Sequence, residues 1–369
     1  MSDVLAKYDT WLEDTGPAAL VIREYLTPVE GYDGVVFPST FAAGDGFPGG
    51  YNIDTFSDGT NVCLIDSVGS QANRIEPLFA NDGYARLVPQ IVIKAGEKRV
   101  NLLEAGHRAG DAIIRCSALK QELQAAFKKV MNGNAELLAN VAPTSMVFGV
   151  WDSRDTQAKL PRLLSSAVRA FNVRKLTRSA QYVPAVEYVN EDLLELPSDQ
   201  KTKDAYAVRG FIHVPAAGTH GGVIATGGIR RDATLHLAAL RLLTVDQDEK
   251  KTRALRRYVL GLALTAFTYS PIGYLRQGCN LVLDPDKKRE FKAVYYDGRR
   301  EDVDVKHKEA FDYAKDVARA FGIDPEREVD FAKPPDREVE FDKELAKKDV
   351  AGDAGGKGGE KAKGKKAKQ

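Results

Sequence analysis

The clearest hydrophobic pattern in the chain is an apolar strand that runs directly into a two-sided helix. Residues 61–66 are mostly apolar, and Asp66 then introduces a segment in which large apolar or small side chains recur at a helical spacing. The members of this apolar stripe are Val68, Ala72, Ile75 and Phe79. The spacing predicts a helix at 68–76 that packs one side on a sheet.

The same periodicities predict further elements. Strands are expected near 34–38, 61–66, 87–94, 145–151, 206–214, 221–226, 280–283 and 292–296. Helices are expected at 68–76, 119–131, 160–172, 231–243, 251–268 and 306–321. Strands and helices mix without the strict alternation of a doubly wound parallel sheet, so the predicted fold class is α+β.

The interior of the 369-residue chain contains no linker rich in proline or serine. We therefore expect one domain, with insertions, over residues 1–348. Residues 349–369 hold six Gly and six Lys, with no large apolar side chain after Val350. Such a segment cannot bury enough surface to offset its ordering entropy, so a disordered basic tail is predicted there.

Charge and cysteine usage narrow the class of protein. The formal net charge is +1, from 53 Lys and Arg against 52 Asp and Glu, so any contact with nucleic acid must come from local clusters of basic residues. The three cysteines, Cys63, Cys116 and Cys279, are odd in number and widely spaced. This argues against a disulfide framework or a zinc site. With no long apolar segment or signal core, a cytoplasmic protein without a membrane span is expected.

Polar side chains gather on the second side of the predicted helix at 68–76. They are Ser67, Ser70, Gln71 and Arg74. Hydroxyl, amide and guanidinium groups at a helix start, where free N–H groups already favour anions, suit contact with a phosphodiester backbone. Asp66 itself suits the helix N-cap.

The strongest local excess of positive charge lies between residues 151 and 178. It comprises Arg154, Lys159, Arg162, Arg169, Arg174, Lys175 and Arg178, against Asp152 and Asp155, which would pair with neighbouring cations. The predicted helix at 160–172 would expose Arg162 and Arg169 on one side, where they could follow phosphates. The alternative is an ordinary solvated helix face. Trp151 could stack on a base or pack in the core.

A glycine-rich run at 218–231 contains His220 and ends in Arg230 and Arg231, an arginine pair expected to open a helix. The run lacks the Gly-Lys-Ser/Thr ending of a P-loop and the GxGxxG spacing of a dinucleotide site. A hairpin with flexible turns is the alternative. His220 is the one candidate general base, although a lone histidine usually makes an ordinary polar contact. The histidines show no metal-binding spacing, so no metal or cofactor is expected.

Three separated strings, DSVGSQANRIE, FGVWDS and GGIRRDATLHLAALRLL, resemble the backbone subunit of the type I-G (formerly I-U) CRISPR Cascade, a RAMP-superfamily protein that binds crRNA. The similarity keeps the same order from about Val35 to Leu283. The resemblance implies an RRM-like, ferredoxin-like palm with large finger and thumb insertions. It implies RNA contacts by Ser67, Ser70, Gln71 and Arg74, which match the family's helix residue by residue. It also implies contacts in segments that match only as a whole, where the expected residues are Arg154, Arg162, Arg169, His220, Arg230 and Arg231.

The expected function is therefore a non-catalytic subunit that polymerises along guide RNA and presents it for pairing with target DNA. Its expected partners are crRNA, the target DNA strand, further copies of itself, other Cascade subunits and, through the complex, a helicase-nuclease. Thr219-His220-Gly221-Gly222 departs from the family's more usual Gly-His-Gly-Asn. Two alternatives stay open: a metal-independent ribonuclease using His220, assisted by Tyr206 or Lys203, and a small-molecule enzyme that holds phosphate with the glycine-rich loop.

Overall fold

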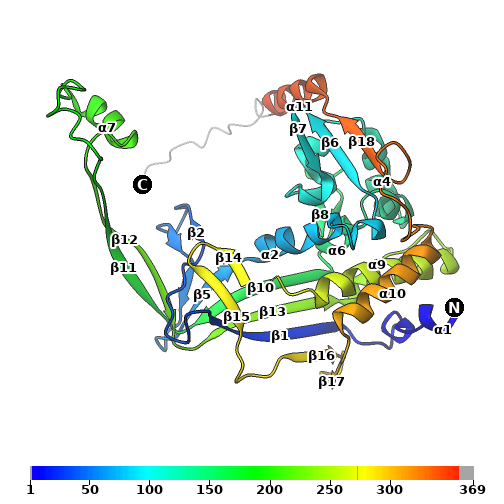
Figure 1. Cartoon of the computed structure of the whole chain (residues 1–369). Helices are drawn as coiled ribbons and strands as arrows, with labels where there is room; N and C mark the ends of the chain where they lie inside the picture. The colour runs from blue at the N-terminus through cyan, green and yellow to red at the C-terminus, as the bar shows by residue number, and fades with distance from the viewer. Residues whose placement is uncertain (1, 272, 357–369) are drawn as a thin grey trace, which may run out of the picture.

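The computed structural model describes residues 2–271 and 273–356 and has the predicted α+β class. Its largest element is a curled, nine-stranded antiparallel sheet (Figure 1). The order along the sheet is β14 (Gly273–Arg276), β15 (Cys279–Leu283), β1 (Ala19–Pro28), β13 (Ile229–His236), β10 (Leu164–Phe171), β5 (Asn61–Asp66) and β4 (Ile53–Thr55). Off this path, β16 (Glu290–Val294) pairs with β1 and with β17 (Arg300–Asp302).

Strand β1 organises the centre of the sheet. One edge pairs with β13 along residues 19–26, while the other edge is shared by β16 at residues 19–23 and β15 at residues 26–28. Leu20 and Ile22 are fully buried, because every second side chain of the strand points into the core. The two edges of β1 therefore join the early and late parts of the chain.

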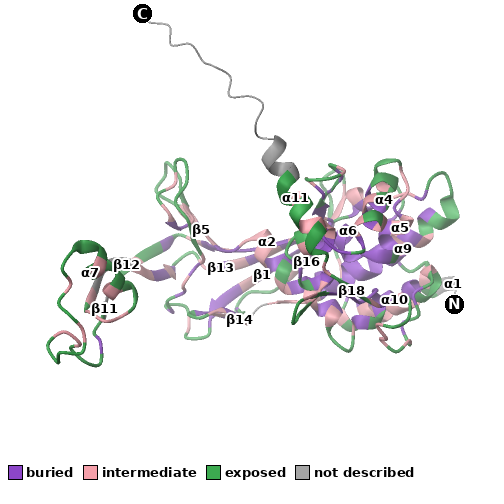
Figure 2. Cartoon of the chain, turned by 90° about the horizontal axis from the view of Figure 1, so that it is seen from above, coloured by how far each residue is buried: buried purple, intermediate pink, exposed green. Residues whose placement is uncertain are grey.

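A two-stranded ribbon continues the sheet outward. Strand β10 leads into β11 (Val173–Tyr182), and β12 (Val214–Ala225) leads back into β13. We call residues 173–225 the arm. It extends away from the body and carries α7 (Gln200–Val208) at its tip (Figure 1). Figure 2 shows that this tip is mostly exposed, whereas buried residues concentrate around α9 and the central strands.

Helices cover one face of the sheet. They are α2 (Val68–Ile75), α4 (Lys120–Met131), α5 (Glu136–Val141), α6 (Thr144–Phe148), α9 (Glu249–Thr268) and α10 (His307–Phe321). α9 and α10 approach closely at Gly261, where a Cβ atom would lie 2.6 Å from Cγ2 of Val317. Phe79, Phe127, Phe148 and Phe267 contribute large buried side chains to the core between this layer and the sheet.

Smaller elements complete the structure. β18 (Arg337–Glu340) pairs in parallel with β6 (Ile91–Ala95), which also pairs with β7 (Lys98–Asn101), and α11 (Lys343–Gly356) follows. The remaining short elements are α1 (Ser2–Leu5), α3 (Ala112–Arg115), α8 (Leu237–Leu240), β2 (Thr40–Phe41), β3 (Gly50–Tyr51), β8 (Val150–Trp151) and β9 (Lys159–Leu160). Single 3₁₀ turns are η1 (Asp9–Trp11), η2 (Glu76–Ala80), η3 (Ala85–Leu87), η4 (Leu102–Glu104) and η5 (Arg108–Gly110).

Several predicted elements are confirmed. The strand at 61–66 is β5, and the strands at 280–283 and 292–296 correspond to β15 and β16. The helices at 68–76, 119–131, 251–268 and 306–321 correspond to α2, α4, α9 and α10. The strands predicted near 87–94 and 221–226 overlap β6 and β12. Each of these segments has a single dominant period, which tertiary packing preserves.

Other predictions are wrong. The helix predicted at 160–172 is β9 followed by β10, because Ala167 is buried next to the buried face of the strand and the apolar side chains then recur at a spacing that also fits a helix. The helix at 231–243 is mainly β13, followed by the short α8. The strand predicted at 145–151 is mostly α6, and the strand predicted at 206–214 is the end of α7 followed by a turn that leads into β12. The segment 34–38 contributes one bridge, between Val36 and Val223.

The C-terminal prediction is corrected in part. The tail predicted at 349–369 begins within α11, and residues 357–369 lie outside the described residues. The three cysteines are free and buried. In residues 2–271 and 273–356, no helix combines the length and apolarity that a bilayer crossing requires.

Candidate nucleic-acid interface

The side chains of helix α2 lie in three different environments. Ala72 and Ile75 are buried in the core, as the apolar stripe predicted. The polar side turns toward Asp66, and Gly69 and Asn73 line a cleft on the remaining side. Ser67, not Asp66, is the N-cap: its hydroxyl accepts a hydrogen bond from the backbone N–H of Ser70 at 3.2 Å.

Asp66 gathers the polar side of α2 around one buried carboxylate. The carboxylate is fully buried and accepts from the Ser70 hydroxyl at 2.8 Å and the Gln71 amide at 2.7 Å. It also accepts from Arg74 Nε at 3.1 Å and from Arg276 Nη2 at 2.6 Å. We call these five residues the Asp66 centre. Four donors on one carboxylate fix the helix against β5 and β14.

Side chains of α2 that were predicted to contact RNA differ in their exposure at the Asp66 centre. Gln71 is fully buried, and its carbonyl accepts from the Ser166 hydroxyl at 2.9 Å. The side chains of Arg74 and Arg276 stay 31% and 23% exposed, so parts of two guanidinium groups reach the surface around one carboxylate. Their RNA contacts remain predictions. Sequence reasoning missed Arg276, which lies far along the chain on β14.

On the Gly69 and Asn73 side of α2 lies a cleft of about 790 Å³, which we call the basic cleft. Its cationic lining residues are Arg108, Arg115, Arg154, Lys159 and Arg162, and the imidazole of His107 lines it as well. No aspartate or glutamate lines it, and all of its lining residues are described. Arg154 and Arg162, predicted from sequence, thus meet in one place, and the cleft presents one sign of charge to a ligand.

The FGVWDS motif forms a wall of the basic cleft. Gly149 adopts φ +78°, and a Cβ atom there would lie 2.6 Å from Cγ of Arg162, so glycine lets Arg162 pack against the chain. β8 pairs with β9, which places Trp151 opposite Lys159. The indole is 56% exposed, with the Lys159 ammonium 5.4 Å from the ring centroid.

A buried ion pair underlies the basic cleft. Arg108 Nε lies 2.5 Å from Glu76 Oε2, and both side chains are almost fully buried. Burial raises the pKa of Glu76 to about 7, although the charge of Arg108 opposes this shift. Burial, followed by the charge of Arg108, lowers the pKa of Arg162. The guanidinium groups of Arg108 and Arg162 thus both act on the single carboxyl group of Glu76.

Acidic residues approach the basic cleft at one edge. Arg115 Nη2 lies 2.8 Å from Asp349 of α11, and its Nε lies 4.0 Å from Asp155. A carboxylate of α11 thus reaches a cationic residue of the cleft, and the hydrogen bond from Arg115 lowers the pKa of Asp349. Asp152, by contrast, is buried and accepts from Thr156 rather than from a basic neighbour.

Removing the acidic partner of Arg115 tests whether this edge of the basic cleft can bind a phosphate. In Asp349→Ala, we expect the dissociation constant for single-stranded RNA at low salt to fall about two- to fivefold, since a surface ion pair contributes about 0.5–1 kcal/mol. Fluorescence anisotropy measures this change. Glu344→Ala removes the same charge from an exposed position of the same helix. An equal gain in both variants would show a general charge effect and contradict a specific contact.

The other predicted residues lie on strands. Arg169 and Arg230 face each other across β10 and β13, and Arg230 pairs with Asp232 at 2.9 Å. Arg231 points to the opposite side, where it is buried 3.1 Å from Glu24. The expectation that this arginine pair opens a helix is therefore wrong, because strand alternation sends the two side chains to opposite faces.

His220 lies on β12 of the arm and is not a member of the Asp66 centre. Its ring makes an edge contact with Tyr51 at 4.8 Å between centroids. Gly50 lies beneath it, where a Cβ atom would be 2.1 Å from His220 Nε2. Among the described residues, no group of three or more His, Cys, Asp or Glu side chains is arranged to hold a metal ion.

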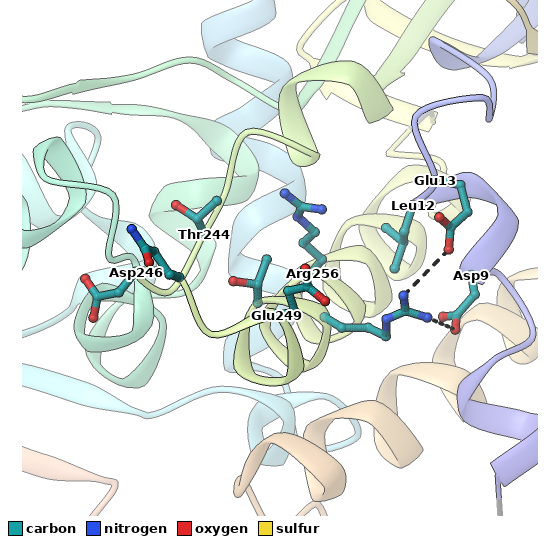
Figure 3. A pocket seen from close by; sticks show the side chains of 10 residues that line it. Asp9, Leu12, Glu13, Thr244, Asp246, Glu249 and Arg256 are labelled. Carbon is teal, nitrogen blue, oxygen red and sulfur yellow. Dashed lines mark hydrogen bonds and ion pairs between the residues drawn. The ribbon is translucent and has the colours of Figure 1, made fainter.

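A second cleft, of about 500 Å³, lies at the start of α9 and has a different character (Figure 3). Arg253 contacts Asp9 at 3.4 Å and Glu13 at 3.9 Å, as the dashed lines mark. Asp246, Glu249 and Arg256 also line it. Acids and bases alternate there, so it lacks the single-sign field of the basic cleft.

Sequence reasoning found part of this interface. It singled out Arg154, Arg162 and the polar side of α2, and the structure places these on two sides of one helix. It missed Arg108 and Arg115, which lie in irregular segments without a periodic signal. A basic pair flanked by glycine, His107-Arg108 between Gly106 and Gly110, was the available signal for a close approach to phosphate.

Part of the chain that includes α2 and the basic cleft matches a known protein family. The model of a family described as CRISPR-associated protein GSU0053 matches residues 20–175, from β1 to the start of β11. The matched segment contains α2 and every lining residue of the basic cleft. A comparison with curated proteins finds no match. The predicted CRISPR association is thus supported: residues 20–175 of the chain are similar to the CRISPR-associated GSU0053 family.

Proposed function

We propose that this protein is a non-catalytic, crRNA-binding backbone subunit of a type I-G CRISPR effector complex. The observation that carries the proposal is the basic cleft, whose five arginine and lysine side chains are unaccompanied by any acidic lining residue. The cleft lies wholly inside the segment that matches a CRISPR-associated family. Side chains of this kind neutralise phosphates irrespective of sequence, which suits a protein that leaves sequence recognition to the guide.

The strand order supports an RRM-like palm. β1, β10, β13 and β15 form a block in which β1 lies between β15 and β13, and β10 lies beyond β13. α2 precedes β10 in the chain, and α9 connects β13 to the final strands. This arrangement agrees with a β-α-β-β-α-β unit. In such a palm, the arm is an insertion between the second and third strands and takes the place of a thumb or finger.

Several features support assembly along RNA. The arm tip exposes large apolar side chains, which are Val183, Leu193, Leu196 and Val208. An exposed apolar patch on a projecting element suits contact with another subunit. A net charge of +1 limits repulsion between copies, and several weak phosphate contacts on one strand add up through avidity. Further copies, other Cascade subunits, target DNA and a helicase-nuclease are the proposed partners in the cytoplasm.

Co-expression with a repeat and spacer transcript tests the function. We expect guide RNA to co-purify at a fixed stoichiometry, with the same length in Mg²⁺ and in EDTA. Recovery of RNA with new 2′,3′-cyclic phosphate ends, abolished by His220→Ala, would favour the ribonuclease alternative. A protein that recovers no guide RNA, and binds none after purification, would overturn the proposal.

The basic cleft should also contribute to the salt dependence of binding. Arg154 and Lys159 are exposed residues of the cleft, so replacing both with glutamine should leave the fold intact. The slope of log K against log salt for single-stranded RNA should fall by about 0.7 for each phosphate that the variant no longer neutralises. Lys250→Gln, exposed at the start of α9, is the matched control. An unchanged slope in the double variant would exclude both residues from binding phosphate.

A further inference from the structure

We propose that the basic cleft accepts a single unstacked nucleotide, whose base stacks on Trp151 while its phosphates lie among the surrounding cations. This inference rests on the proposed function and adds a mode of contact to it. Trp151 is the only aromatic residue that lines the cleft, apart from the imidazole of His107, and all lining residues are described. The cleft therefore combines a flat apolar surface with charges that attract phosphate.

The exposure of Trp151 is fixed by its surroundings. Its backbone pairs with Lys159 across β8 and β9, and a Cβ atom at Gly110 would lie 3.0 Å from the Trp151 carbonyl oxygen. The backbone is thus held from two sides while the indole remains 56% exposed. A tryptophan side chain has only two rotatable bonds to order, so covering it with a ligand costs little conformational freedom.

The cations are distributed around the indole. Lys159 lies 5.4 Å from the ring centroid, and Arg154 and Arg162 line the same cleft. Arg108 contributes a buried amino group, Nη2, that has no hydrogen-bond partner. Asn73, on α2, adds an amide that can both donate to and accept from the edge of a base. Phosphate and base can therefore be satisfied at neighbouring points of one cleft.

A nucleotide of a single strand suits the indole and cations of the basic cleft better than a duplex does. Within a duplex the base faces are covered by their neighbours, whereas a splayed nucleotide offers a free face for stacking. A cleft of about 790 Å³ lies within the usual range for small-molecule sites, about 300–1,000 Å³. Bare phosphate would use the cations but leave the indole uncovered, so the base is part of the expected ligand.

Tryptophan fluorescence provides a direct test, because the chain contains only two tryptophans. The second, Trp11, stacks on Tyr8 at 4.6 Å between centroids and belongs to a different part of the structure. In Trp11→Phe, we expect emission from Trp151 to be quenched by an oligouridine but not by an abasic oligonucleotide of equal length and charge. Anisotropy with labelled strands should show that both ligands bind.

Affinity measurements complete the test. Trp151→Ala should weaken binding of the oligouridine about tenfold and leave binding of the abasic strand unchanged, since base stacking on an aromatic side chain contributes about 1–3 kcal/mol. Trp151→Phe should restore most of the affinity. Phe56→Ala, an exposed aromatic residue in the turn between β4 and β5, is the matched control. If Trp11→Phe does not fold, the quenching difference between the natural protein and Trp151→Ala gives the same information.

The outcomes separate this inference from the proposed function. If the protein binds neither strand and no guide RNA, the proposed function fails. If both strands bind without quenching, or if both quench equally, the function stands and the stacking site is overturned. If the fluorescence is quenched as the protein concentration rises in the absence of RNA, Trp151 belongs to a contact between subunits. That result would also overturn the stacking site.

Discussion

Replacing Asp66 with alanine is expected to lower the free energy of unfolding by about 3 kcal/mol. The substitution leaves the donors of Ser70, Gln71, Arg74 and Arg276 without their shared acceptor. Buried donors that lose a partner carry their full desolvation penalty. Arg74 and Arg276 are partly exposed, so their guanidinium groups can form hydrogen bonds with water instead. The decrease in the free energy of unfolding is therefore expected at the lower end of the range for a broken buried ion pair. Urea unfolding at pH 7 measures it.

Asp54→Ala provides the matched comparison for Asp66. Asp54 is exposed on β4, the strand adjacent to β5, and its removal should change stability by no more than about 0.5 kcal/mol. Asp66→Asn keeps the size of the side chain and one acceptor, so it should fall between the two. If Asp66→Ala were no worse than Asp54→Ala, the carboxylate would not hold α2 against the sheet.

Arg108→Met should destabilise the protein by about 3–5 kcal/mol at pH 8 and by clearly less at pH 5. Removing the guanidinium leaves Glu76 buried without its cation, and Arg162 is then the remaining charge near it. Because the charge of Arg108 lowers the pKa of Glu76, its removal should raise that pKa above the present value of about 7. Chemical denaturation at the two pH values measures the difference.

The sign of this pH dependence follows from proton binding. The folded protein holds a proton on Glu76 between its ordinary pKa of 4.5 and about 7, whereas the unfolded chain has released it. The associated stability is present below about pH 4.5 and is lost as the pH rises through about 7. In Arg108→Met this decline should continue to higher pH. Adding Glu76→Gln to that variant should remove the extra pH dependence, and its persistence would assign the effect to another group.

The fold was predictable where one period dominates and one face is buried. α2, α4, α9 and α10 have such patterns, and their bounds were found to within a few residues. The prediction for β10 was wrong because the buried side chains of Leu163, Leu164, Ala167 and Val168 fit a helical spacing as well as a strand. β10 lies between β13 and β5 in the sheet. Only the pairing of distant strands decides between helix and strand here.

The sequence predicted which residues belong to the candidate interface better than it predicted their secondary structure and orientation. Basic residues between 151 and 178 indicated the correct segment, yet its helix was wrong, and Arg169 lies on β10 rather than beside Arg162. The polar side of α2 was correctly grouped, but its four residues were expected to face outward. Asp66 draws Ser70, Gln71 and Arg74 toward it because a carboxylate at the end of a buried strand requires donors. Ser67 instead caps the helix.

Because the arm continues β10 and β13, its length can change in evolution without a change in the sheet. The arm leaves and re-enters the sheet through two strands that are already neighbours. Insertions of two residues in each of β11 and β12 would preserve which side chains point to each face and would lengthen the ribbon by about 7 Å. Relatives of this chain can therefore change the distance between arm tip and body in discrete steps, with the sheet, the Asp66 centre and the basic cleft left in place.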